Sequence, residues 1–245
     1  MVKYEMLKND TKVVDGVTVY RIVALEDFGD VKKGDLGGYI EYYTNLSLHD
    51  DCWIYDNAVA LGCSTIEQSA TVRDNAIIKG KAYLANDCTV SGNAIIDGNI
   101  IVGDFVEVSG NAVITGRAMI IDEATIKGNT KIKGGDKALE TVIGGNVSIL
   151  GDGNEISGDI SLKGDLTIAG GARITGKSDV LHITGVFNGE GCITKYTSKD
   201  GFRFVTREAM CKDGLEVGST SWEEGTAPKV KESVYSMIKA FELLS

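Results

Sequence analysis

Residues 88–114, CTVSGNAIIDGNIIVGDFVEVSGNAVI, contain a repeat of six residues. A small or aliphatic residue recurs every six positions, and a second aliphatic residue follows it two places later. The pair recurs without a slip over residues 52–132, because positions 52 and 130 are thirteen steps of six apart. Its first members are Cys52, Ala58, Ser64, Ala70, Ala76, Ala82, Cys88, Ala94, Ile100, Val106, Ala112, Ala118, Ala124 and Thr130. Its second members are Ile54, Ala60, Ile66, Val72, Ile78, Leu84, Val90, Ile96, Val102, Val108, Ile114, Ile120, Ile126 and Ile132.

A six-residue period is incompatible with an α-helix, whose 3.6 residues per turn would spread these side chains around its axis. In a strand, residues two apart point to the same side, so each hexad supplies one short strand with two inward side chains and then a corner. Three corners close a triangular coil of eighteen residues. The pattern therefore predicts an all-β fold, a parallel β-helix of hexapeptide repeats.

The corners are expected between the strands, where Gly and Asn recur. Glycines stand two places before the inward small residue, at Gly80, Gly92, Gly98, Gly110, Gly116 and Gly128. Asparagines stand one place before it, at Asn57, Asn75, Asn93, Asn99, Asn111 and Asn129. Both residue types tolerate the positive φ angles that tight corners need.

Residues 1–45 do not follow the six-residue rule, and we expect an N-terminal β cap there because the open end of a β-helix exposes unpaired backbone groups. Within it, residues 17–25 alternate as a strand does, and Asp35-Leu36-Gly37-Gly38 is typical of a turn. The β-helix is expected over 46–181, with a loop insertion at 133–146. That insertion either is a tolerated surface loop or lines a ligand groove.

The repeat resumes after the insertion, at Ile149, Ile156, Leu162, Ile168, Ile174 and Val180. The step from Ile149 to Ile156 is one residue too long, and it contains Asp152-Gly153-Asn154. We interpret it as a widened corner in preference to a calcium site, because no nonapeptide repeat surrounds it. Residues 182–245 are expected to form a C-terminal cap, with strands at 193–197 and 202–206 and an amphipathic helix at 230–244.

The N-terminal sequence resembles one group of proteins in its run from Ile22 to Ile40, IVALEDFGDVKKGDLGGYI, then in Asn45-Leu46-Ser47 and in DCWIYDNA from Asp51 to Ala58. These motifs are similar to the YdcK-like hexapeptide-repeat proteins of bacteria and many phages, often labelled transferases or polymer-forming proteins. The resemblance implies a left-handed β-helix and a phage or prophage origin. The transferase label rests on fold analogy, which does not carry a function.

Charge and cysteine content exclude several classes of partner, compartment and metal site. A formal net charge of −10 argues against binding nucleic acid or an anionic membrane. The N-terminus has no apolar signal region and no run approaches a membrane span, so we expect the cytoplasm, that of the host if the gene is phage-borne. Five cysteines without a CxxC motif predict a reducing compartment and no zinc site.

Catalytic chemistry has little support in the sequence. A CoA-dependent acyltransferase needs a general base, usually His, beside the acceptor hydroxyl. The two histidines are His49, before the regular coils, and His182, after them. We interpret His49 as an exposed corner residue, whereas His182 has an inward, capping or catalytic role. We therefore predict no catalytic residue, no cofactor and no metal, and keep acyl transfer as the alternative.

A small anionic ligand such as a nucleotide is the one partner that the C-terminal region suggests. Residues 192–212 hold five basic against two acidic residues in an acidic chain. With a two-residue turn at Asp200-Gly201, Tyr196, Arg203 and Arg207 would share one hairpin face, and Lys195 lies beside them. An aromatic ring with guanidinium groups suits a nucleotide or phosphate. An ordinary solvated face remains the alternative.

The outward positions suggest self-assembly. The first face of the coil carries mostly polar residues, beginning with Trp53 and Thr71. The second carries Val59, Ile77, Ile95 and Val113, and the third carries Tyr83, Ile101 and Met119. Contiguous apolar ladders outside a filled rod mark interfaces, and two adjacent ones suit a three-fold ring. We therefore expect a non-catalytic, homotrimeric β-helix scaffold or binding protein. The C-terminal helix folded along one face is the alternative cover.

Overall fold

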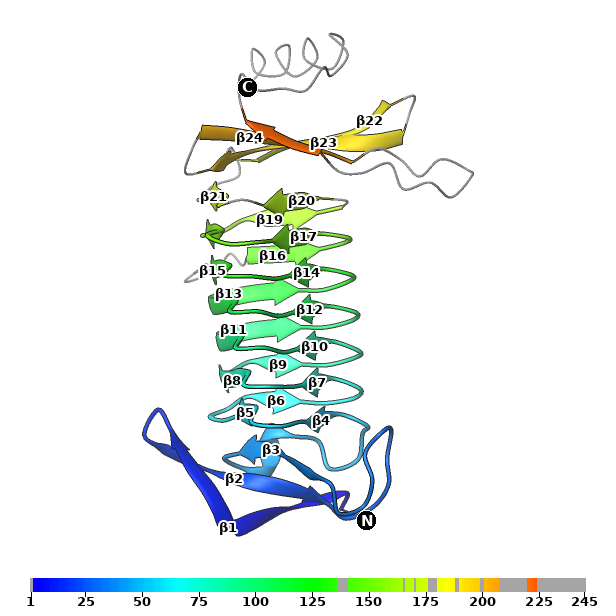
Figure 1. The fold of residues 1–245 in the computed structure, drawn as a ribbon, viewed down its shortest axis with the longest axis vertical. Helices are drawn as coiled ribbons and strands as arrows, with labels where there is room; N and C mark the ends of the chain where they lie inside the picture. Colours follow the sequence, from blue (N-terminus) through cyan, green and yellow to red (C-terminus); the bar gives the residue numbers. More distant parts are fainter. Residues whose placement is uncertain are drawn as a thin grey trace.

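The computed structural model describes residues 2–135, 141–164, 166–169, 171–175, 180–187, 190–198, 201–207 and 220–223, with side chains up to residue 175. It is a rod of stacked coils (Figure 1), with an N-terminal antiparallel hairpin at one end and a four-stranded sheet at the other. Each coil contributes one short strand to each of three faces, and strands of successive coils pair in parallel.

The strands of the three faces alternate along the chain. The first face contains β4 (Trp53–Ile54), β7 (Thr71–Val72), β10 (Thr89–Val90), β12 (Glu107–Val108), β14 (Thr125–Ile126), β17 (Ser148–Leu150) and β20 (Thr167–Ala169). The second contains β3 (Leu36–Ile40), β5 (Val59–Ala60), β8 (Ile77–Gly80), the first halves of β11 (Ile95–Val102) and β13 (Val113–Ile120), β15 (Lys131–Lys133), β18 (Glu155–Ser157) and β21 (Arg173–Ile174). The third contains β6 (Thr65–Ile66), β9 (Tyr83–Leu84), the second halves of β11 and β13, β16 (Thr141–Gly144) and β19 (Ser161–Lys163).

The predicted core is confirmed. Ile96 pairs with Ile78 on one side and Ile114 on the other, each eighteen positions away. Every residue of the two inward series over 52–132 is at most 1% exposed. The chain is therefore an all-β parallel solenoid whose inside is filled by its own repeat, while its left hand stays a prediction.

The corners turn on one residue of positive φ in each hexad, two places before the small inward residue. Between Asp56 and Gly128, seven of these thirteen residues are glycines, namely the six predicted ones and Gly62, and at Gly98 an added Cβ would lie 2.2 Å from the carbonyl oxygen of Gly116. The others are Asp, Asn or Gln, which the sequence patterns did not single out. Five of these six side chains accept a backbone N–H of the next coil, as Asp74 does from Gly92 at 2.7 Å, whereas Asn86 donates its Nδ2 to Asp104 at 2.9 Å. These residues thus supply the hydrogen bond that a glycine corner lacks.

The N-terminal cap is a hairpin of β1 (Tyr4–Val14) and β2 (Val17–Ala24), and β2 also pairs with β3. Gly37 and Gly38 lie in β3, so the predicted turn there is wrong. A Cβ at Gly37 would lie 2.6 Å from Trp53, so close packing on the first coil requires glycine. A short 3-10 helix, η1 (Tyr43–Asn45), then leads into the coils.

Lys3 covers the N-terminal end of the rod, at the first coil. Its side chain is 1% exposed, and its Nζ donates to the carbonyl oxygens of Asp50 and, at 2.8 Å, Cys52. The Nζ also lies 4.8 Å from the centre of the Phe28 ring. Burial lowers the pKa of this ammonium. The cap therefore pairs carbonyls that the first coil would otherwise leave open.

The predicted loop insertion at 133–146 is too long. Lys133 is still in β15, and Thr141–Gly144 form β16, whose Ile143 is buried and pairs with Ile120. Those two partners are 23 positions apart instead of eighteen. Five extra residues therefore enter this coil, and the inward row recovers its register after them.

The widened corner holds a buried amide. Asn154 is fully buried at the inward small position above Thr130. Its Nδ2 donates to the carbonyl oxygen of Leu150 at 2.9 Å, and its Oδ1 accepts from the backbone N–H of Ala172 at 3.0 Å. The carboxylate of Asp152 accepts from Asn129 Nδ2 at 2.6 Å. These contacts account for the Asp-Gly-Asn sequence as a corner.

The far end of the rod carries an antiparallel sheet in the order β22 (Val180–Phe187), β23 (Glu190–Ser198), β24 (Gly201–Arg207) and β25 (Thr220–Glu223). β23 and β24 contact β20 and β21 of the last coil. The two strands predicted here are confirmed within longer ones. The helix predicted at 230–244 lies outside the described residues.

Candidate functional site

The third face displays a continuous apolar column. Tyr83 and Ile101 are 38% and 36% exposed and occupy paired positions on β9 and β11. Met119 and Val142 continue the column on β13 and β16, both half-buried. The Tyr83 hydroxyl donates to Glu67 at 3.0 Å, so its ring lies at the polar start of the column. The residues that we predicted for this surface therefore point outward together.

The second face differs from the prediction at its N-terminal end. Val59 is 2% exposed, because it packs with Val19, Tyr39 and Leu61 beneath the cap. Ile77 is half-buried against the same cluster. Val59 is therefore part of the intramolecular core, and assigning it to an interface between copies was wrong. The remaining column, Ile77, Ile95 and Val113, continues along β8, β11 and β13.

The first face is polar, as its sequence predicts. The hydroxyl groups of Thr71 on β7 and Thr89 on β10 form a hydrogen bond of 3.0 Å. Farther along, Lys127 pairs with Glu107 at 2.9 Å. Trp53 is the exception, since the cap buries it against Tyr4 and Phe28. The apolar outward side chains thus gather on two of three faces.

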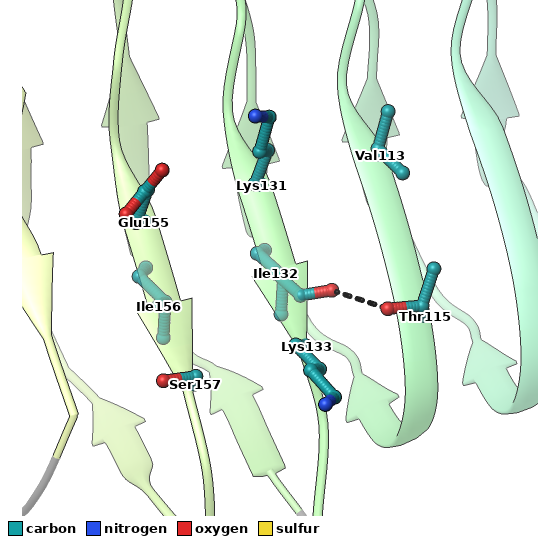
Figure 2. A pocket seen from close by; sticks show the side chains of 8 residues that line it. All are labelled: Val113, Thr115, Lys131, Ile132, Lys133, Glu155, Ile156 and Ser157. Atoms are coloured by element: carbon teal, nitrogen blue, oxygen red, sulfur yellow. Dashed lines mark hydrogen bonds between the residues drawn. The ribbon is translucent and has the colours of Figure 1, made fainter.

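A groove of about 310 Å³ opens on the second face where its apolar column ends. It crosses β13, β15 and β18, and Figure 2 shows its side chains in two rows. The register defines the rows as Val113, Lys131 and Glu155, then Thr115, Lys133 and Ser157. Ile132 and Ile156, whose side chains point into the rod, lie between them. The groove therefore has charged and hydroxyl-bearing walls.

The sequence patterns did not single out Lys131, Lys133 or Glu155 as site residues. On the second face the aliphatic outward residues end at Val113, and the pairing of Lys131 with Glu155 spans 24 positions because of the extra residues between them. A search at the eighteen-residue spacing consequently misses it. The one available signal was the replacement of aliphatic outward residues by charged ones on the second face after position 113.

Neither histidine is among the described residues that line this groove. His49 is exposed at a corner before the first regular coil, and its backbone N–H donates to Ser47 Oγ at 3.4 Å. His182 lies in β22, paired with Thr194. Cys52 and Cys88 are buried at inward positions, where burial raises the pKa of each thiol. Among the described residues, no group of three or more His, Cys, Asp or Glu could hold a metal ion.

The predicted anion-binding residues lie on β23 and β24. Tyr196 pairs with Arg203, Lys195 with Phe204, and Arg207 with Cys192. Ser198 pairs with Gly201, so the expected turn at Asp200-Gly201 is displaced by one residue. The backbone register thus brings positions 196 and 203 together, and ligand binding there stays a prediction.

The comparisons with known proteins find one short similarity. The chain is 40% identical over 57 residues to "Uncharacterized acetyltransferase YdcK" of Escherichia coli (strain K12), which is 23% of this chain and 18% of that protein. The match therefore spans less than a fifth of that relative's length. No family model matches the chain. The resemblance to the YdcK-like proteins is thus confirmed for this short stretch, together with a parallel β-solenoid.

In the residues that the structure describes, no helix has the length and apolar character needed to cross a bilayer.

Proposed function

We propose that this protein is a non-catalytic scaffold that assembles from copies of itself, side by side, into a homotrimer. The second and third faces of neighbouring rods form the contact, with Ile77, Ile95 and Val113 of one copy against Tyr83, Ile101 and Met119 of the next. Such a heterologous contact closes into a ring when the rotation between copies is 120°.

The observation that supports the proposal is the outward apolar column on the third face. Ile101 is 36% exposed beside Tyr83 at 38%, on a rod whose interior is already filled. Contiguous exposed apolar surface of this kind marks interaction sites in soluble proteins. The polar first face provides the solvent-facing side, because its threonines satisfy one another. The cap limits the contact to the middle of the rod, since it covers Val59.

Light scattering after gel filtration tests the assembly. The wild type should elute with three times the mass of one chain. Ile95→Asp and Ile101→Asp should each give monomers, because a ring needs both faces of every copy. Thr89→Asp, on the first face, is the matched control and should stay trimeric. A monomeric wild type, or an Ile101→Asp variant that remains trimeric, would contradict the proposal.

Acyl transfer is the second candidate, and the similarity to a protein with acetyltransferase in its name supports it. A histidine base would be His49 or His182, since these are the two histidines of the chain. Turnover of acetyl-CoA with small amine and hydroxyl acceptors tests this candidate. Activity that His49→Ala or His182→Ala abolishes would establish the enzyme and overturn the non-catalytic proposal.

A further inference from the structure

The groove on the second face lies between the two irregular sites of the solenoid. Strand β15 precedes the five extra residues, and β18 follows the widened corner at Asp152-Gly153-Asn154. Its walls are the rows Val113, Lys131, Glu155 and Thr115, Lys133, Ser157. Neighbouring strands are about 4.8 Å apart and alternate residues of one strand about 6.6 Å, so these groups surround a space of small-molecule size.

The charged groups of this groove differ from other charges on the rod, because the described residues offer them no ion-pair partner. Elsewhere on the rod, Lys79 pairs with Asp15 at 2.6 Å and Lys127 with Glu107 at 2.9 Å. Lys131, Lys133 and Glu155, in contrast, make no ion pair with any residue that the structure describes. Two ammonium groups and one carboxylate therefore line the groove, with Lys131 and Lys133 extending toward its opposite ends (Figure 2), in a chain whose net charge is −10.

We propose that this groove binds a free acidic α-amino acid, of the class of L-glutamate. The ligand carries two carboxylates and one ammonium group, which complements the two ammonium groups and one carboxylate of the groove. Its carboxylates accept from Lys131 and Lys133, and its ammonium donates to Glu155. The hydroxyl of Ser157 lies beside Lys133 in the register and adds a donor to the same carboxylate, whereas the Thr115 hydroxyl donates to the carbonyl oxygen of Ile132 at 3.5 Å.

The pattern of charges separates this ligand from simpler ions. A dicarboxylate without an amine would bring its negative charge beside Glu155 with no ammonium group to offset it, and a diamine would meet Lys131 and Lys133. Because the charges are solvent-exposed, each pair contributes little, and we expect a dissociation constant on the order of 1 mM. The proposal does not depend on self-assembly, since all of its groups come from one chain.

Ligand-observed NMR titration of the full chain at low ionic strength tests the site, with L-glutamate, succinate and L-lysine as probes. L-glutamate should saturate, with a dissociation constant about tenfold below that of either other probe, which corresponds to about 1.4 kcal/mol. Lys133→Met and Glu155→Gln should each weaken it by a similar factor. Lys81→Met, an exposed lysine on a distant corner, is the matched control and should leave it unchanged.

Three results would overturn the proposal: no saturation by L-glutamate, equal affinity for succinate, or equal weakening by Lys81→Met. Circular dichroism confirms that the variants fold, which exposed positions should allow. Repeating the titration on Ile101→Asp separates the site from the trimer. Binding that persists in this variant supports a site within one chain, whereas binding lost on dissociation contradicts it.

Discussion

The regular coils of residues 52–132 and the irregular coils of residues 141–174 keep the same core but differ in their corners. In the first region, Ile96 and Ile114 pair across eighteen positions. In the second, Ile132 pairs with Ile156 across 24 and Ile143 with Leu162 across 19. All six side chains are buried. A solenoid therefore tolerates extra residues at its corners, provided that the inward row returns to register.

The corner chemistry changes with the region. In the regular coils, the exposed amides of Asn93, Asn111 and Asn129 form a side-chain ladder, with Nδ2 to Oδ1 distances of 2.9 and 2.7 Å. In the irregular coils, the ladder ends at Asp152, and the buried amide of Asn154 takes over. The irregular region thus depends on one buried polar group where the regular region depends on a repeated, exposed one.

Removing an inward side chain from the regular coils should have the largest effect. Ile96→Ala deletes buried methyl and methylene groups between Ile78 and Ile114 and should lower the free energy of unfolding by about 2–5 kcal/mol. Thr125→Ala changes an outward residue on the polar first face and should cost about 1 kcal/mol or less. Urea unfolding of both variants measures the difference. Equal losses would contradict the assignment of inward and outward rows.

Removing the buried amide should affect the irregular coils less strongly. Asn154→Ala leaves the carbonyl of Leu150 and the N–H of Ala172 without their partner, which should cost about 1–3 kcal/mol. Asn111→Ala removes an exposed rung of the ladder, where water replaces the lost bonds, and should cost about 0.5–1 kcal/mol. Urea unfolding again measures both. A larger loss in Asn111→Ala would show that the exposed ladder holds the coils.

The sequence predicts the features that follow from the six-residue repeat, and it predicts few of the contacts outside that repeat. The buried rows and the β class follow from periodicity, because every inward position obeys it. The sequence does not show that the cap covers Val59, since that contact joins residues about forty positions apart with no shared period. Nor does periodicity place Lys131 beside Glu155, because the extra residues set that register. Sites built at interruptions of a repeat need coordinates to be found.

Alkaline pH should lower the stability of the regular coils more than that of the irregular coils. This is the smallest of the predicted differences at neutral pH. The described side chains of the irregular coils include no cysteine, whereas Cys88 is buried in the regular ones. Burial raises the pKa of this thiol from 9.0 to about 12. The folded state therefore holds the proton more tightly than the unfolded state.

The stabilisation from the protonated Cys88 thiol is complete below pH 9 and is lost as the pH rises toward 12, at up to about 1.4 kcal/mol per pH unit. Cys88→Ala removes this titration, and Ala fits because it fills most equivalent inward positions. The free energy of unfolding of the wild type should fall more steeply between pH 9 and 10.5 than that of Cys88→Ala, although tyrosines contribute to both. Thr89→Ser, a neighbouring outward change, is the control and should follow the wild type. Parallel pH profiles for wild type and Cys88→Ala would mean that the thiol titrates in the folded coil as it does in the unfolded chain, which its complete burial argues against.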